Sequence, residues 1–156
     1  MKISEILEES IISVGLDAAD KTDAINQIVD LANNSGKILN LEKVRGCVLE
    51  REKLVSTGVG KGFAITKKKT DAISDITAAF AILKNPIDFE SIDLQPVKFI
   101  FLLVGKENLL NAHIKLLSRI SRLMNKDEFR QRLSESKTSK EVLEIFKEEE
   151  QSFLDV

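Results

Sequence analysis

Hydrophobic residues recur every three to four positions through much of this 156-residue chain, which is the period of an amphipathic helix. The pattern predicts helices at residues 22–33, 41–54 and 108–124, and two shorter helices that begin at Asn125 and Thr138. Asn125 and Thr138 are each followed three residues later by a glutamate, the spacing of a capping box. The C-terminal third of the chain is therefore predicted to be helical.

Two runs, at residues 78–83 and 97–104, are almost continuously apolar, which predicts strands buried on both faces. Phe63-Ala64-Ile65 is a third, shorter strand candidate, and Pro86 and Pro96 are placed in the connection between the two long strands. Helices that precede, separate and follow the strands predict an α/β fold, a three-layer sandwich with a mixed central sheet and helices on both faces.

Composition narrows the class of protein. A hydrophobic content of 43% without a linker-like segment predicts a single domain over residues 1–156. A net charge of −2 gives no overall attraction to nucleic acid, and the longest apolar run, around residues 99–104, is too short for direct membrane insertion. One cysteine, Cys47, allows no internal disulfide, and the start of the chain does not resemble a signal segment. We expect a soluble, cytoplasmic protein.

The stretch from Arg51 to Thr70 carries the candidate chemistry. Alternating glycines let the backbone approach a ligand closely, and hydroxyls and backbone N–H groups beside an arginine suit an oxyanion. The residues concerned are Arg51, Ser56, Thr57, Gly58, Gly60 and Gly62. The Gly-Lys-Ser/Thr ending of a nucleotide-binding loop is missing. A glycine-rich turn that leads into a strand is the alternative interpretation.

The chain contains one histidine, His113, which falls on the apolar side of the helix predicted at residues 108–124. A packed core histidine is the simpler interpretation. Beside Arg51 the same imidazole would supply a hydrogen-bond donor or a proton switch near neutral pH. Without a second histidine we expect no metal site, and nothing in the sequence requires a cofactor.

These residues resemble a known family. Arg51-Glu52, the segment 56–60, Gly62 and Ala64-Ile65 are similar to the active-site motif of fructose- and mannitol-type enzyme IIA domains of the bacterial phosphotransferase system. That group includes the nitrogen-regulatory IIA proteins, and the resemblance continues through residues 111–117 to the last helix.

The resemblance implies roles for several positions. In the family, the strand after the glycines ends in Pro-His, and this histidine accepts a phosphoryl group from the small carrier protein HPr. Here the two positions are Thr66 and Lys67. Arg51 matches the arginine that steadies the phosphoryl group, and His113 matches the second histidine that faces the reactive one.

The lysine at position 67 changes the functional expectation. At its ordinary pKa near 10.4 a lysine is an ammonium without a lone pair, unless burial or neighbouring cations lower the pKa. The run Lys67-Lys68-Lys69 either adds positive charge at the mouth of the pocket or forms a solvated turn.

We therefore expect a IIA-like regulatory domain that is not phosphorylated at the usual site and that binds an anion or a partner protein, either an HPr-like phosphocarrier or a regulatory target. Two alternatives stay open: a phosphocarrier that uses His113 as its catalytic residue, and a module that binds a small anionic metabolite. The expected anion-binding residues are Arg51, Ser56, Thr57, Gly58, Gly60, Thr66, Lys67 and His113.

Overall fold

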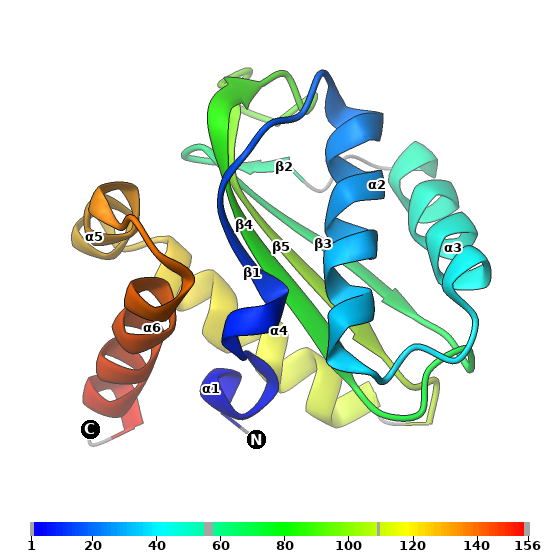
Figure 1. Cartoon of the computed structure of the whole chain (residues 1–156). Coiled ribbons are helices and arrows are strands. Elements are labelled where there is room, and N and C mark those ends of the chain that lie inside the picture. The colour runs from blue at the N-terminus through cyan, green and yellow to red at the C-terminus, as the bar shows by residue number, and fades with distance from the viewer. Residues whose placement is uncertain (1, 55–57, 109, 155–156) are drawn as a thin grey trace.

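A mixed five-stranded sheet forms the centre of the computed structural model, which describes residues 2–54, 58–108 and 110–154 (Figure 1). The strands are β1 Ile12–Leu16, β2 Gly58–Gly60, β3 Phe63–Lys69, β4 Thr77–Ile87 and β5 Val97–Gly105. They lie in the order β1-β4-β5-β3-β2. The pairs β1–β4 and β3–β5 are parallel, whereas β4–β5 and β2–β3 are antiparallel.

Helices lie on both faces of this sheet (Figure 1). They are α1 Ile3–Ile6, α2 Lys21–Ala32, α3 Leu41–Leu54, α4 Leu110–Met124, α5 Asp127–Glu135 and α6 Ser139–Leu154. On one face of the sheet, α2 packs on β4 and β5, and α3 packs on β3. On the other face, α4 packs on β3 and β5, and α6 contacts β1. The predicted three-layer α/β sandwich with a mixed sheet is confirmed.

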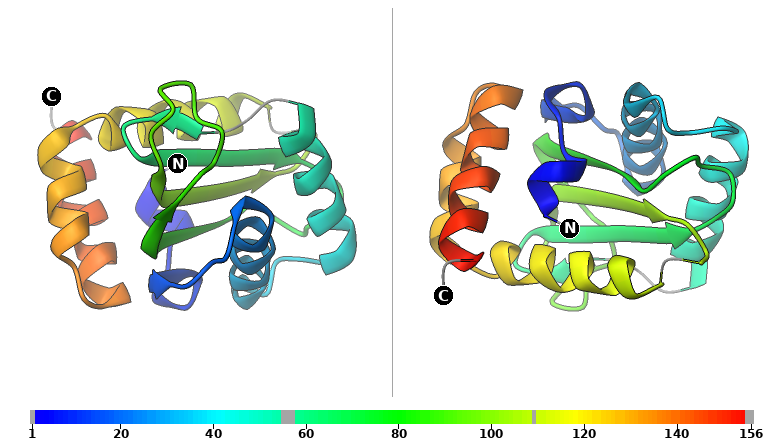
Figure 2. Two further views of the ribbon diagram at one scale, coloured as in Figure 1. Left: turned by 90° about the horizontal axis from the view of Figure 1, so that it is seen from above. Right: turned by 90° about the horizontal axis from the view of Figure 1, so that it is seen from below.

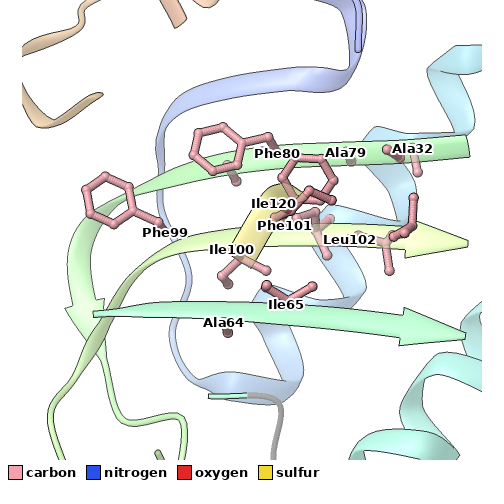
Figure 3. Packing of buried hydrophobic residues seen from close by; sticks show 14 of the residues in the cluster. Ala32, Ala64, Ile65, Ala79, Phe80, Phe99, Ile100, Phe101, Leu102 and Ile120 are labelled. Carbon is pink, nitrogen blue, oxygen red and sulfur yellow. The ribbon is translucent and has the colours of Figure 1, made fainter. Parts of the chain in front are cut away.

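The core is built from the apolar runs of the central strands, whose side chains pack between Ala32 of α2 and Ile120 of α4 (Figure 3). Phe80 and Phe101 are register partners on β4 and β5, so both point to the same face. Phe146 of α6 meets Phe80 edge-on with ring centroids 5.2 Å apart. The contact between these two rings therefore holds α6 against the sheet.

Several elements differ from the sequence prediction. β3 continues past Ile65 through Lys69, and β2 had no strand signal of its own. β4 continues through Pro86, which the sequence placed in a connection. That placement was wrong because the pairing of β4 with β5 shifts register between Ile82 and Ile87, so proline, which lacks an N–H, is tolerated there.

The two predicted helix caps have different outcomes. Thr138 caps α6, since its hydroxyl accepts a hydrogen bond from the backbone N–H of Glu141. The Asn125 cap was wrong: α5 begins after Lys126, without a side-chain cap. Within the described ranges, the structure contains no helix with the length and apolar character needed to cross a membrane.

Candidate anion-binding site

A pocket of about 560 Å³ lies where the last turn of α3 and the end of β3 meet the start of α4. In both views of Figure 2 these three ends lie on the same side of the molecule. The lining residues are Arg51, Lys67, Lys68, Lys69, Glu107, His113, Ile114 and Leu117. Among the described residues, four basic side chains and an imidazole thus share the pocket with one carboxylate. We call this site the basic pocket.

Arg51 enters the basic pocket from the last turn of α3, and its position is fixed by its neighbour. Glu52 is buried and forms an ion pair with Lys21 at 2.8 Å between Nζ and Oε1. The Lys21 ammonium also lies over the ring of Phe89, 5.0 Å from its centroid. These contacts hold the end of α3 against α2, and therefore hold Arg51 at the pocket.

The three consecutive lysines belong to β3. Lys67, Lys68 and Lys69 pair in parallel with Leu103, Val104 and Gly105 of β5. Among the described residues, β2 pairs only with the beginning of β3, at Phe63 and Ala64, so the strand end that carries the lysines borders the pocket. All three lysines are partly buried. The solvated-turn interpretation of this run is therefore wrong.

The environment of Lys67 differs from that of a surface lysine. Burial lowers the pKa of Lys67, the charge of Arg51 lowers it further, and the carboxylate of Glu52 acts in the opposite direction. The two conditions under which a lysine loses its proton more readily, burial and a neighbouring cation, are thus both present. At equilibrium a larger fraction of this amine carries a free lone pair than in a solvated lysine.

His113 is a packed residue and a pocket residue at once. Its side chain is 5% exposed, and its Nδ1 has no hydrogen-bond partner in the part of the chain that the structure describes. Burial lowers the pKa of His113, and the charges of Lys69 and Lys67 lower it further. The imidazole is therefore neutral at physiological pH, and it keeps a lone pair that can accept a proton or bind an electrophile.

Gly105 makes this position of the imidazole possible. A Cβ atom on Gly105 would lie 2.4 Å from Nδ1 of His113, closer than any real contact. Sequence reasoning did not identify Gly105, because the contact joins the end of β5 to α4 and leaves no local pattern.

Gly105→Ala is therefore expected to displace the His113 ring and to lower the free energy of unfolding by about 1–3 kcal/mol, the usual range for overpacking. Denaturant unfolding measures the loss, and NMR titration should find the pKa of His113 closer to its ordinary value. Gly46→Ala is the control, since a Cβ on Gly46 of α3 meets nothing within 4 Å. Unchanged stability of Gly105→Ala would contradict the described packing.

The other expected anion-binding residues that the structure describes are not part of the basic pocket's lining. Gly58 and Gly60 form β2 and are not among the described residues that line the basic pocket. A Cβ on Gly58 would lie 2.3 Å from Oγ of the buried Ser91, so this glycine permits close packing. Thr66 is fully buried in β3. Ser56 and Thr57 lie outside the described residues, and a binding role for all of these positions stays a prediction.

Three of the pocket residues were not anticipated. Glu107 precedes α4, and Ile114 and Leu117 follow His113 on that helix. Leu117 could have been placed at the pocket from its spacing, four residues from His113 on one helix face. Within the described ranges no group of three or more His, Cys, Asp and Glu residues is arranged to hold a metal ion.

The nitrogen-regulatory IIA protein of Neisseria meningitidis has the same fold, with a TM-score of 0.86 and 30% sequence identity over 92% of this chain and 98% of that one. A solved complex of the Escherichia coli mannitol IIA domain with its phosphorylated IIB partner contains the fold as well, at a TM-score of 0.77 and 21% identity over 90% of this chain and 96% of that one. The fold is therefore that of IIA-type phosphotransferase domains.

Sequence comparison gives the family. Residues 5–149 match the family described as "Phosphoenolpyruvate-dependent sugar phosphotransferase system, EIIA 2", and the chain belongs to it. It is 34% identical over 146 residues to the fructose-specific EIIA component of Haloferax volcanii, covering 94% of this chain and 95% of that protein. It is 32% identical over 145 residues to the fructose-specific EIIABC component of Bacillus subtilis, covering 93% of this chain but only 23% of that longer protein.

Proposed function

We propose that residues 1–156 form one regulatory IIA-type domain that binds an anionic group in the basic pocket and carries no phosphoryl group at the usual position. The observation that supports this function best is the convergence of Arg51, the three lysines of β3 and His113 on one pocket with a single carboxylate. Several donors that meet at one negative centre bind it through charge-assisted hydrogen bonds, which are the stronger kind.

The residue at position 67 decides between binding and transfer. By resemblance, the family's phosphorylated histidine falls on Lys67. The pKa of Lys67 is lowered from an ordinary lysine value near 10.4, and whenever its amine keeps its proton it is a cation without a lone pair. A fixed cation next to Arg51 holds a phosphate or carboxylate and does not take up the phosphoryl group. The site therefore binds an anion without turning it over.

We propose a protein as the partner, one that presents a phosphorylated or acidic surface. The related E. coli domain forms its complex with a phosphorylated IIB protein, which is a partner of this chemistry. HPr-like carriers and regulatory targets both fit the description. We place the interaction in the cytoplasm, where an unpaired thiol such as Cys47 is stable.

A second candidate, a small anionic metabolite, is favoured by the size of the pocket. Its volume of about 560 Å³ falls within the range of small-molecule sites. A third, phosphoryl transfer through His113, is favoured by the neutral imidazole and opposed by its burial. Intact-mass analysis after incubation with phosphoenolpyruvate, enzyme I and HPr separates the third from the first.

Sulfate is expected to raise the melting temperature of the protein more than chloride does at equal ionic strength. A ligand that binds only the folded state stabilises it by about 2.7 kcal/mol at one hundred times its Kd. Thermal unfolding across a sulfate series measures the effect, and Lys61→Gln, at an exposed lysine outside the described pocket lining, should respond like the wild type. Equal shifts with sulfate and chloride would contradict the anion site.

The stability of the protein, with and without sulfate, is predicted to depend on pH through His113. Because the pKa of folded His113 lies below its ordinary value of 6.5, the unfolded state binds more protons between the two values. Without sulfate, the free energy of unfolding should therefore fall as the pH drops below 6.5 toward the folded pKa. A bound sulfate favours the protonated ring, so its stabilising effect should grow over the same interval.

A further inference from the structure

We propose that Lys67 is a modification site for acyl phosphates: the basic pocket binds the phosphate of such a compound, and the amine of Lys67 takes its acyl group. The proposal rests on the anion-binding function above and adds a means to regulate it. Two features of the site carry it, the placement of a half-buried amine within an anion pocket and the presence of a proton acceptor in the same pocket.

The first feature concerns the neighbours of Lys67. Its side chain is partly buried at the end of β3, where charged groups either act on its amine or line the same pocket. These groups are Arg51 and Glu52 from α3, Lys68 and Lys69 from β3, Glu107 from the segment before α4, and His113 from α4. Burial and the charge of Arg51 disfavour the ammonium form of Lys67, and the excess of cations in the pocket favours a phosphate beside it.

The second feature is His113. His113 and Lys67 line the same pocket, and burial, the charge of Lys69 and the charge of Lys67 all lower the pKa of His113. A neutral imidazole close to an amine can accept the proton that the amine loses when it attacks an electrophile. In the described part of the chain, Lys67 is the lysine whose pKa is lowered by Arg51 and whose charge acts on His113.

An acyl phosphate fits both features, because its carbonyl carbon is bonded directly to an oxygen of its phosphate. A pocket that binds the phosphate therefore holds the carbonyl carbon close to the amine. The neutral Nζ of Lys67 attacks that carbon, the new C–N bond forms, and the C–O bond to phosphate breaks. The phosphate leaves with the bonding electrons, stabilised by Arg51 and the remaining lysines. The amine's surplus proton passes to His113 and from there to the departing phosphate, which leaves as hydrogen phosphate. The products are an N-acyl-lysine and inorganic phosphate.

Acylation would change the binding function through charge. It converts one cation of the basic pocket into a neutral amide, so anions should bind more weakly. It also removes one of the charges that lower the pKa of His113, which should rise. In the family that this chain resembles, phosphorylation of the histidine at this position makes the pocket more negative. Acylation of Lys67 would also make the pocket more negative, because it removes a positive charge.

The test uses the full chain, acetyl phosphate as the probe, and peptide mass spectrometry to follow each lysine over time near neutral pH. Lys61 is the reference, an exposed lysine on the turn between β2 and β3. We expect Lys67 to be acetylated severalfold faster than Lys61, since the pocket binds the phosphate of the probe beside its amine. Excess sulfate and the change Arg51→Ala should each remove this preference. Acetic anhydride, which brings no phosphate for the pocket to bind, should show a smaller preference for Lys67 over Lys61 than acetyl phosphate does.

Equal acetylation of Lys67 and Lys61, or a preference that sulfate leaves unchanged, would overturn the proposal. A parallel sulfate melting series separates this failure from failure of the proposed function. Sulfate stabilisation without preferential acetylation would refute the modification site and leave the anion site in place. If sulfate neither stabilises the protein nor protects Lys67, both inferences are refuted.

Discussion

Replacing Thr66 with proline and Lys67 with histidine should turn this chain into a phosphoryl acceptor, raising labelling from none to one phosphoryl group per molecule. Position 67 lies at the end of β3 in the pocket that Arg51 and His113 also line. An imidazole placed there would keep its lone pair among neighbouring cations, which disfavour its protonated form. Arg51 would remain in place to steady the incoming phosphoryl group, the role that the resemblance gives it.

The measurement is intact mass after incubation with phosphoenolpyruvate, enzyme I and HPr. Thr66 is buried within β3, so proline at that position could disturb the strand. Lys67→His alone keeps the backbone N–H of Thr66 and serves as the second variant. Circular dichroism checks that both variants are folded. If both fold and neither gains a phosphoryl group, the basic pocket is not a competent phosphoryl site and its assignment fails.

Arg51→Ala is expected to weaken sulfate binding at least about tenfold, which corresponds to about 1.4 kcal/mol and lies near the lower end for a hydrogen bond to a charged group. The pKa of Lys67 should rise in the same variant, because a nearby positive charge that lowers it has been removed. Both effects follow from one side chain, and they can be measured independently by a sulfate melting series and by NMR titration of the lysine Nζ.

Arg45→Ala is the matched control. Arg45 lies on the same helix, pairs with Asp30 and Glu42, and is not among the described residues that line the basic pocket. Its loss should leave sulfate binding and the pKa of Lys67 unchanged even if it lowers stability. An Arg51→Ala protein that binds sulfate like the wild type would show that the anion site lies elsewhere.

The sequence predicted the elements whose pattern is local. The helix expected at residues 41–54 is confirmed as α3 Leu41–Leu54. It could be predicted because apolar residues spaced three and four positions apart indicate the buried side of a helix. The mixed sheet followed from helices placed before, between and after two nearly continuous apolar runs, which are typical of strands buried on both faces. The placement of Arg51 near His113 came from the family resemblance, and both residues do line one pocket.

The features that the sequence did not predict depend on tertiary contacts. A run of three lysines has the composition of a turn, yet pairing with β5 draws Lys67–Lys69 into a strand. The position of His113 depends on Gly105, which is close in space only after β5 and α4 have packed. Likewise, the altered pKa of Lys67 results from burial and from Arg51, and neither can be read from the neighbouring residues in the chain.

The most direct test of the central claim is intact-mass analysis of the unmodified chain after incubation with phosphoenolpyruvate, enzyme I and HPr from one source, alongside an active IIA protein. The proposed function predicts that the control gains a phosphoryl group while this chain gains none and is still stabilised by sulfate. The addition of one acid-labile phosphoryl group would contradict it, and its location on His113 would identify a phosphocarrier that uses the second histidine of the pocket.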